Sequence, residues 1–574
     1  MPLKKAVGIL KLQSVPRERR RKKMIKCKVE NCGGIPSITV NGNKINACAY
    51  MTYFDENSRA GEFAKKGYKL FSVCTYFSDL PINEYSGFSP CRGNGIFECG
   101  EDYSEFDRNV RAVLEKCPDA YIFPRVYITM PRAWTVENPA EVAKTTITPT
   151  GRELLYSKKF RRDGGELLKK FIRHTEQSDY ADNIIGYQVS GGQTQEWFYF
   201  DLNGGFCQNA LPYYKEYMHK NGVEVSELPK EADETYYRFC NVCAAETVEH
   251  FARIAKEESG KIVGAFYGYS VEVNSPGFGT HALGRIADSQ YIDFFCSPVS
   301  YRNLRALKTD SADMIPRASV CARGKMYFTE ADIRTHLSDY PEKSRKDIKL
   351  TVPYRGAVWK GGHTTQDDIL HLRKVLAKCL CSGKALWWFD MWGGWYDSVI
   401  DVMEEYNRIL NLPGGSYSSK KCKAAVFIDE TAPKGELCIT VAACGVPYDI
   451  FLAQDYSLAK DYGLFISLTE NNEDMRIYAQ NNNIPCFCAV DMNKDEISHA
   501  IDSCRFTRVN RENIVYLGNG FLALHGVKTG ETQPCFDKKV RLTDVENEKR
   551  SFEGEIISVF INECETAIFK IEEV

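Results

Sequence analysis

The stretch Lys325-Met-Tyr-Phe-Thr-Glu330-Ala-Asp332 joins a largely apolar run to two acidic residues at its end. A short run of this kind is typical of a strand that is buried on both faces, as the strands of a parallel sheet are. The chain contains eight such runs, at 47–53, 69–76, 120–128, 184–190, 261–268, 291–296, 325–330 and 385–390. Their recurrence predicts eight parallel strands, of which residues 325–330 form the seventh.

Longer amphipathic segments separate these runs. Residues 105–116, 165–174, 234–258 and 364–380 have the pattern of helices, and the last segment begins with acidic residues in its first turn. Eight alternations of strand and helix predict a (β/α)₈ barrel, also called a TIM barrel. A doubly wound open sheet is the competing architecture. It would usually carry a glycine-rich turn after its first strand, where this chain has Phe54-Asp-Glu-Asn57.

The segments outside the barrel differ in character. We expect residues 1–35, which include the basic run 17–23, to be a disordered leader, and residues 36–412 to form the barrel. Short apolar runs at 423–429, 437–442, 462–468 and 484–490 predict a small flavodoxin-like α/β domain over 413–504. Short strands with polar turns predict a small antiparallel β domain over 505–574.

Composition argues against several classes of function. The formal net charge is −2 over 574 residues, which gives no sign of nucleic-acid binding or of attraction to a membrane surface. No apolar run approaches the ~20 residues needed to cross a bilayer, and no secretory signal is visible. The 22 cysteines lack framework spacing, which is typical of reduced cysteines in a cytoplasmic protein. We expect no metal site, because no second Cys-x-x-Cys or partnered histidine pair accompanies Cys240-Asn-Val-Cys243.

Two glutamates follow apolar runs at the places where a barrel carries its functional groups, the carboxyl ends of the strands. Glu196 follows the fourth run, in Ser190-Gly-Gly-Gln-Thr-Gln-Glu-Trp197, and Glu330 ends the seventh. Strands four and seven lie roughly opposite one another in such a barrel, so the two carboxyl groups are expected to face each other across its mouth. Cleavage of a glycosidic bond needs such a pair, one protonated and one ionised.

This arrangement resembles the clan A glycoside hydrolases. In layout it is similar to the family 42 β-galactosidases and the family 164 β-mannosidases, which join a barrel to an α/β trimerisation domain and a small β domain. The resemblance covers about residues 36–574, with local similarity at the strand ends only. It implies that Glu196 is the acid/base and Glu330 the nucleophile, that no cofactor takes part, and that the chain forms a homotrimer.

The resemblance also bears on residues close to the two glutamates. Many clan A enzymes have asparagine directly before the acid/base, where this chain has Gln195, whose longer amide could bind the same sugar hydroxyl. A tyrosine after strand six often bonds the nucleophile, which makes Tyr301 a candidate, although ordinary packing would explain it equally well. Arg125, at the exit of strand three, could orient a carboxylate.

Other residues at the strand ends could contact a sugar. Arg334 and His336 follow Glu330 and could bind substrate or cap their own loop. The eighth run ends in Trp387-Trp-Phe-Asp-Met-Trp392, a cluster that favours an aromatic platform under the sugar. We expect Trp388 and Trp392 to form that platform and Asp390 to bind a hydroxyl group.

The sequence therefore predicts a retaining exo-β-glycosidase that hydrolyses terminal β-mannosides or β-galactosides by double displacement. The alternative is a non-catalytic carbohydrate-binding barrel, in which the carboxyl groups would not lie ~5–5.5 Å apart. A third interpretation, an aldolase or a metal-dependent hydrolase, needs a Schiff-base lysine or a His/Asp cluster at strand ends. It is weaker, because the 9 histidines include no pair at ligand spacing on a strand. The sequence does not choose the sugar.

Overall fold

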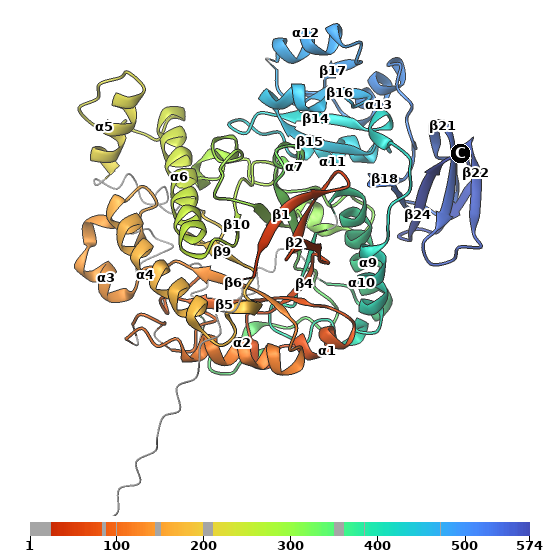
Figure 1. Cartoon of the computed structure of the whole chain (residues 1–574). Coiled ribbons are helices and arrows are strands. Elements are labelled where there is room, and N and C mark those ends of the chain that lie inside the picture. The colour runs from red at the N-terminus through yellow and green to blue at the C-terminus, as the bar shows by residue number, and fades with distance from the viewer. Residues whose placement is uncertain are drawn as a thin grey trace, which may run out of the picture.

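The computed structural model describes residues 25–82, 88–93, 95–98, 100–143, 151–198, 210–348, 350, 361–383, 385–470 and 472–574. Its centre is a closed barrel of eight parallel strands (Figure 1). In chain order these are β4 (Cys48–Met51), β5 (Leu70–Tyr76), β6 (Tyr121–Tyr127), β9 (Gly186–Ser190), β10 (Ile262–Phe266), β11 (Phe294–Pro298), β12 (Met326–Ala331) and β13 (Leu386–Phe389). Each strand lies in or overlaps one of the eight apolar runs, so the predicted barrel is confirmed.

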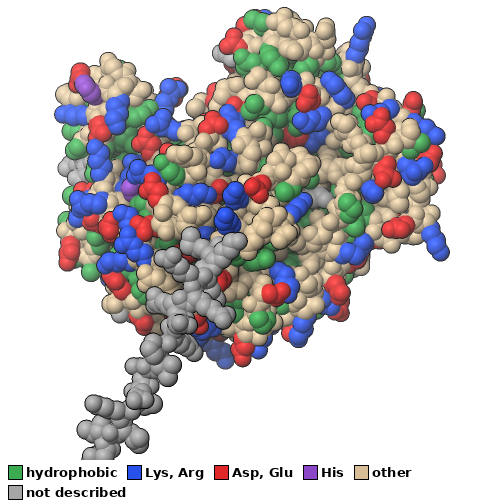
Figure 2. Space-filling model, viewed as in Figure 1, with side chains coloured by type: hydrophobic (Ala, Val, Ile, Leu, Met, Phe, Trp, Pro, Cys, Tyr) green, Lys and Arg blue, Asp and Glu red, His purple; other side chains and the backbone are tan. Residues whose placement is uncertain are grey.

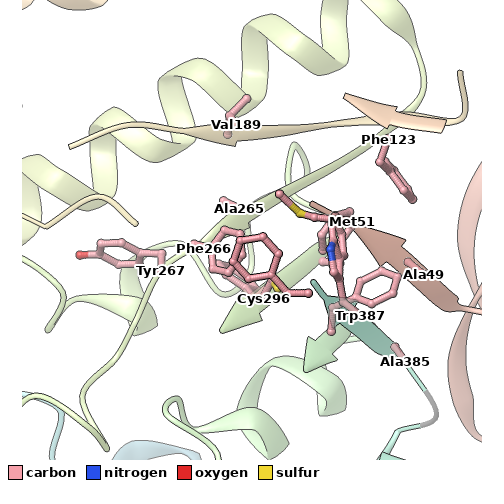
Figure 3. Close-up of a cluster of buried hydrophobic side chains, with 14 of the residues drawn as sticks. Ala49, Met51, Phe123, Val189, Ala265, Phe266, Tyr267, Cys296, Ala385 and Trp387 are labelled. Carbon is pink, nitrogen blue, oxygen red and sulfur yellow. The ribbon is translucent and has the colours of Figure 1, made fainter. Parts of the chain in front are cut away.

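Aromatic side chains fill the barrel interior. Ring contacts run from Phe123 on β6 to Phe294 on β11, then to Phe328 on β12 and Trp387 on β13, with centroids 5.1–5.5 Å apart. Figure 3 shows Phe123, Met51 and Trp387 gathered in this interior. The neighbouring strand β10 makes room for the Phe294 ring with a glycine, because a Cβ atom at Gly264, the register partner of Phe294, would lie 2.0 Å from that ring. The barrel is therefore a packed core, as expected for this architecture.

Helices surround the barrel (Figure 1). The predicted helices are present as α2 (Ser104–Lys116), α4 (Lys158–Gln177), α6 (Glu234–Ser259) and α9 (Thr365–Ser382). Thr364 and Asp367 form a capping box at the start of α9, which explains the acidic first turn seen in the sequence. The remaining helices of this part are α1 (Ala60–Lys65), α3 (Arg132–Glu137), α5 (Ala210–Lys220), α7 (Arg317–Ala322), α8 (Pro341–Ser344) and α10 (Val402–Asn411), and the short strands β7 (Val142–Ala143) and β8 (Arg152–Glu153) pair with each other.

The N-terminal part of the described chain differs from the expected leader. Residues 1–24 lie outside the described residues, but β1 (Cys27–Cys32) pairs antiparallel with β2 (Ile35–Val40), which also pairs with β3 (Asn43–Lys44). The expectation of disorder through residue 35 is therefore wrong from Cys27 onward. Gly33 and Gly34 form the turn at positive φ, and Ile38 and Val40 are buried, so a hairpin with one apolar side replaces the predicted leader.

A four-stranded parallel sheet forms the α/β domain, with the order β15-β14-β16-β17. Its strands are β14 (Ala424–Ile428), β15 (Tyr448–Leu452), β16 (Leu464–Ser467) and β17 (Cys486–Cys488), and its helices are α11 (Glu436–Ala443), α12 (Glu473–Asn481) and α13 (Lys494–Ser503). The apolar run 437–442 is helix α11, not a strand. Its buried residues Cys438, Val441 and Ala442 follow helical spacing, and the second strand, β15, lies further along the chain.

The C-terminal part is antiparallel, as predicted. Five strands pair in the order β18-β19-β24-β21-β22, and two short strands, β20 and β23, pair beside them. Their bounds are β18 (Ile514–Gly518), β19 (Phe521–His525), β20 (Gly530–Thr532), β21 (Cys535–Asp544), β22 (Ser551–Ile556), β23 (Val559–Ile561) and β24 (Thr566–Glu573). Strands β18 and β19 pack on the barrel helix α9, so this sheet is attached to the barrel.

The face of the molecule seen in Figure 2 carries charges of both signs. Figure 2 shows acidic and basic side chains interspersed over the visible side of the molecule, in keeping with the net charge of −2. Within the described ranges, no helix is long and apolar enough to cross a membrane.

Replacing Gly264 with alanine tests the packing of the barrel interior. The new methyl group would overlap the Phe294 ring, so we expect the free energy of unfolding to fall by about 1–3 kcal/mol, measured as a lower thermal midpoint. Gly61→Ala in α1 is the control, because its Cβ atom would meet only the flexible Lys116 side chain at 3.3 Å. A midpoint that is unchanged in Gly264→Ala would contradict the packing described.

Candidate active site

Glu330 lies on β12 at the carboxyl end of the barrel and forms a buried ion pair with Arg125 of β6. Arg125 Nη1 donates to Glu330 Oε2 at 3.0 Å, and the two residues are 1% and 3% exposed. Burial raises the pKa of Glu330, and the Arg125 guanidinium counters that effect. The negative charges of Asp332 and Glu196 add to the rise, so the three carboxyl groups share one electrostatic environment. The predicted role of Arg125 in orienting a carboxylate fits this contact.

The loop that carries Glu196 has a strained backbone. Thr194, Gln195 and Trp197 all have positive φ values, at 54°, 66° and 60°, and such values cost non-glycine residues of order 1–3 kcal/mol each. The buried Trp197 ring anchors the loop, because a Cβ atom at Gly191 would lie 2.5 Å from that ring. The Gly191-Gly192 pair therefore allows close packing of the loop on Trp197.

Hydroxyl groups hold the Glu196 carboxyl group. Thr194 Oγ1 donates to Oε2 at 2.6 Å, and Tyr269 OH donates to Oε1 at 2.8 Å. Burial raises the pKa of Glu196, and these two hydrogen bonds lower it. Hydrogen bonds from neutral donors stabilise a carboxylate less than a neighbouring cation does. The two glutamates therefore differ in kind, since only Glu330 has a direct cationic partner among the described residues.

Tyr301 does not bond Glu330. Its hydroxyl donates to Asp332 Oδ2 at 2.7 Å, and the Arg305 guanidinium pairs with the other oxygen of the same carboxylate. The prediction that Tyr301 contacts the nucleophile is therefore wrong. Strand β12 ends at Ala331, so Asp332 lies just beyond the strand that carries Glu330.

The predicted tryptophan platform is only partly supported. Trp388 lies on the outer face of β13, where its Nε1 donates to Tyr68 OH at 3.0 Å and its ring stacks on Tyr406 of α10. That position is incompatible with a floor under a sugar. Trp392 is 1% exposed and packs on Tyr53, whose ring centre lies 5.9 Å from Arg125 Cζ. Trp392 therefore lies beside the site, packed against other aromatic rings.

Two further predicted residues, Asp390 and His336, have structural partners. Asp390 accepts hydrogen bonds from the backbone N–H groups of Gly394 and Trp395 and from Tyr50 OH. It is completely buried, so it holds the loop after β13 and does not present a free carboxylate to a sugar. His336 is hydrogen-bonded to Asp368 through its ring and its backbone N–H, which supports the loop-capping alternative.

The last two predicted residues, Arg334 and Gln195, have different surroundings. Arg334 lies near an aromatic ring and Gln195 near a hydroxyl group. Arg334 is 8% exposed and its Cζ lies 5.1 Å from the Trp395 ring centre. Gln195 is fully buried; its Nε2 donates to Thr129 Oγ1 at 3.4 Å, while its Oε1 has no hydrogen-bond partner among the described residues. An unpaired buried acceptor is costly unless water or a ligand bonds it. Gln195 therefore remains a candidate ligand for a hydroxyl group.

Two polar residues of β9, Gln188 and Ser190, are not among the site residues predicted from the sequence. Gln188 pairs in register with Arg125 and is completely buried, and both ends of its amide lack a hydrogen-bond partner in the described chain. Ser190, two residues further on the same face, has an unpaired buried Oγ atom. The available signal was two polar residues at alternate positions in the otherwise apolar run 184–190. Tyr269, after β10, gave no such signal.

The described residues include no group of three or more histidine, cysteine, aspartate or glutamate side chains placed to hold a metal ion.

Replacing Arg125 tests how far the ion pair offsets the free-energy cost of burying the Glu330 carboxylate. We expect Arg125→Met to destabilise the protein by about 3–5 kcal/mol at pH values well above 8, because the pKa of Glu330 is raised to about 8 and its buried charge is then left alone. The additional change Glu330→Gln should recover part of this loss, measured in a double-mutant cycle by chemical denaturation.

The same variant has a predicted pH dependence. Loss of the guanidinium raises the folded-state pKa of Glu330 above its wild-type value of about 8, so the penalty relative to the wild type grows as the pH rises above that value and disappears as the pH falls below it. The stability of Arg125→Met should therefore approach that of the wild type in acid. Additive single losses with no pH trend would contradict the ion pair.

Comparison with known proteins identifies the fold. No protein-family model matches the chain, and no curated protein matches it in sequence. The β-galactosidase of Bacillus circulans sp. alkalophilus is similar in structure, with a TM-score of 0.57 and 9% identity over 91% of this chain and 98% of that one. Gan42B, a GH42 β-galactosidase, gives a TM-score of 0.56 at 9% identity, covering 92% and 98%. A catalytic mutant of Gan42B from G. stearothermophilus gives 0.54 at 8% identity, again covering 92% and 98%. The chain thus resembles the clan A glycoside hydrolases of family 42 in fold, along nearly its whole length.

Proposed function

We propose that this protein is a retaining glycosidase that hydrolyses terminal β-linked hexosides. The observation that carries the proposal is the unequal pairing of two buried glutamates at the barrel mouth. Glu330 has a guanidinium partner at 3.0 Å, whereas Glu196 is bonded by the hydroxyl groups of Thr194 and Tyr269. A retaining mechanism needs one carboxylate that stays ionised and one carboxyl group that exchanges a proton.

The environment of each residue supports one role. Burial raises the pKa of both glutamates, that of Glu330 to about 8, so the direction of the pKa shift does not separate their roles. The cationic partner does: a guanidinium remains charged at all physiological pH values, so Arg125 stabilises the ionised form of Glu330 and favours it as the nucleophile. Glu196 is buried, its pKa is raised, and hydroxyl groups can accept or donate hydrogen bonds as its protonation changes. These properties suit an acid that gives up a proton and takes it back.

The reaction proceeds in two displacements. Glu330 attacks the anomeric carbon while Glu196 donates its proton to the departing oxygen, so the C–O glycosidic bond breaks as the glycosyl–Glu330 ester forms. Glu196, now ionised, takes a proton from a water molecule that attacks the same carbon and releases Glu330. The pKa of Glu196 falls during the first step, because the negative charge of Glu330 is consumed.

The finer assignments rest on resemblance. The solved structures that it resembles are β-galactosidases by name, so β-galactosides come first among the substrates we propose, with β-mannosides second. The homotrimer is a proposal of the same kind, whereas the cytoplasmic location is proposed from the 22 cysteines, which lack framework spacing. Size-exclusion chromatography with light scattering would test the trimer.

Replacing each of the two glutamates with alanine tests their roles. Glu330→Ala should abolish hydrolysis of an activated nitrophenyl glycoside, and added azide should restore turnover with an α-glycosyl azide as product. Glu196→Ala with azide should give the β-glycosyl azide, because the nucleophile remains in place. Nuclear magnetic resonance of the products distinguishes the two anomers. Unchanged hydrolysis by Glu330→Ala would contradict the assignment of Glu330 as the nucleophile. A wild type that binds nitrophenyl glycosides but never cleaves them would favour the carbohydrate-binding alternative.

The pH profile tests the hydroxyl contact to Glu196. Thr194 donates to the carboxylate form and lowers its pKa, so Thr194→Val should raise that pKa and move the basic limb of kcat/KM to higher pH. Tyr187→Phe is the matched control, because that hydroxyl lies on the outer face of β9 against Thr175 and Glu176. A basic limb that stays in place in Thr194→Val would argue against Glu196 as the acid.

A further inference from the structure

The loop after β10 connects Glu196 to the α/β domain. Tyr269 donates its hydroxyl to Glu196 at 2.8 Å, and its ring packs edge-on against Phe198, 5.4 Å away, in the loop that carries Glu196. Two residues further along, the side chain of Val271 packs outside the barrel. It is 1% exposed, and its neighbours belong to another part of the chain.

Val271 is packed into the hydrophobic core of the α/β domain. Every other fully buried member of its cluster lies between residues 424 and 489 or on α13, and these members are Ala424, Val426, Ile428, Cys438, Val441, Cys444, Val446, Ile450, Leu464, Ile466, Leu468, Ala489, Ile497 and Ile501. The side chain of one barrel-loop residue is thus part of a core that otherwise belongs to β14, β15, β16 and their helices.

Backbone contacts fix this insertion on both sides. Gly435, just before α11, approaches so closely that a Cβ atom there would lie 1.8 Å from the carbonyl oxygen of Val271. Arg302 donates to the same carbonyl oxygen at 2.9 Å and to that of Glu272 at 3.0 Å. The N–H group of Val271 donates to the Met314 carbonyl oxygen at 3.0 Å. The segment has no room to shift without disturbing the α/β domain.

The next residue extends the connection to the other side of the mouth. The Glu272 carboxylate accepts hydrogen bonds from Ser300 Oγ at 2.6 Å and from the Tyr301 backbone N–H at 3.1 Å. Tyr301 in turn bonds Asp332, two residues beyond Glu330. The segment 269–272 therefore lies between the α/β domain and both carboxyl-bearing walls of the site.

We propose that the α/β domain positions the acid/base of the active site, with Val271 and Gly435 as positioning residues that act on Glu196 through Tyr269. The inference rests on the proposed glycosidase function and adds a role for a domain that otherwise only packs against the barrel. Val271 is held in the α/β core, Tyr269 is held by its chain connection to Val271, and Glu196 takes its orientation from the Tyr269 hydroxyl group.

Misplacing the acid/base has a signature that general destabilisation lacks. Proton donation matters greatly when the leaving group is a poor one and little when it is a dinitrophenolate, which departs without a proton. A shifted Tyr269 should therefore slow cleavage of an alkyl β-glycoside far more than cleavage of a dinitrophenyl β-glycoside of the same sugar.

The experiment uses Gly435→Ala in the full-length chain. We expect kcat/KM for the alkyl glycoside to fall by about tenfold or more, a fraction of the 10²–10⁴-fold contribution of a general acid, with less than about a threefold change for the dinitrophenyl glycoside. Hydrogen exchange read by mass spectrometry supplies a readout that does not need activity, and it should show faster exchange in the peptides that contain Tyr269 and Glu196.

Gly463→Ala is the matched control. It is the same substitution in the same domain, and its Cβ atom would lie 1.9 Å from the Lys421 carbonyl oxygen, away from the loop after β10. It should loosen the α/β domain without the leaving-group effect or faster exchange near Tyr269. A Gly435→Ala variant that slows both substrates equally and leaves exchange unchanged, or a Gly463→Ala variant with the same selective loss, would overturn the proposal.

The two proposals fail in distinguishable ways. A wild type that cleaves neither glycoside overturns the glycosidase function, and with it this inference. A wild type that cleaves both, together with a Gly435→Ala variant that behaves like Gly463→Ala, leaves the glycosidase in place and removes the positioning role.

Discussion

The ion pair between Arg125 and Glu330 is the constraint on which the site depends. A guanidinium that is 1% exposed cannot lose its proton, so the barrel must supply an anion within contact distance. Glu330 supplies it at 3.0 Å. The aromatic contacts from Phe123 to Trp387 fill the interior, and Gln188 lies buried in register with Arg125 with its amide unpaired among the described residues. A fixed charge and unpaired polar atoms together suit a polar ligand at the carboxyl ends of the strands.

The sequence predicted the barrel because its strands are buried on both faces, and continuous apolar runs such as 325–330 are visible without knowledge of contacts. It also placed Glu196 and Glu330 correctly at the ends of strands β9 and β12, since position along a strand follows directly from the sequence. The face of a strand is harder to predict. Trp387 points into the barrel and Trp388 points out, and in a run buried on both sides no polar residue marks which is which.

Contacts between loops could not be predicted, because they depend on tertiary structure. Tyr301 reaches Asp332 and not Glu330, and Tyr269 reaches Glu196 although 73 residues separate them. The backbone of Thr194 and Gln195 has positive φ, which no sequence rule assigns to such residues. The apolar run 437–442 forms helix α11, and its sequence alone does not reveal this, since short apolar runs do not distinguish a strand from a buried helix. These differences all lie where packing, and not local preference, decides the conformation.

The central claim is that Glu330 forms a covalent bond with the sugar while Glu196 handles the proton. A 2-deoxy-2-fluoro glycoside with a good leaving group should accumulate the intermediate, because fluorine slows both steps and the leaving group rescues the first. Peptide mapping of the labelled protein by mass spectrometry would then locate the sugar. The account predicts one sugar per chain on the peptide that contains Glu330. A label on the Glu196 peptide, or turnover with inverted configuration and no label, would contradict it.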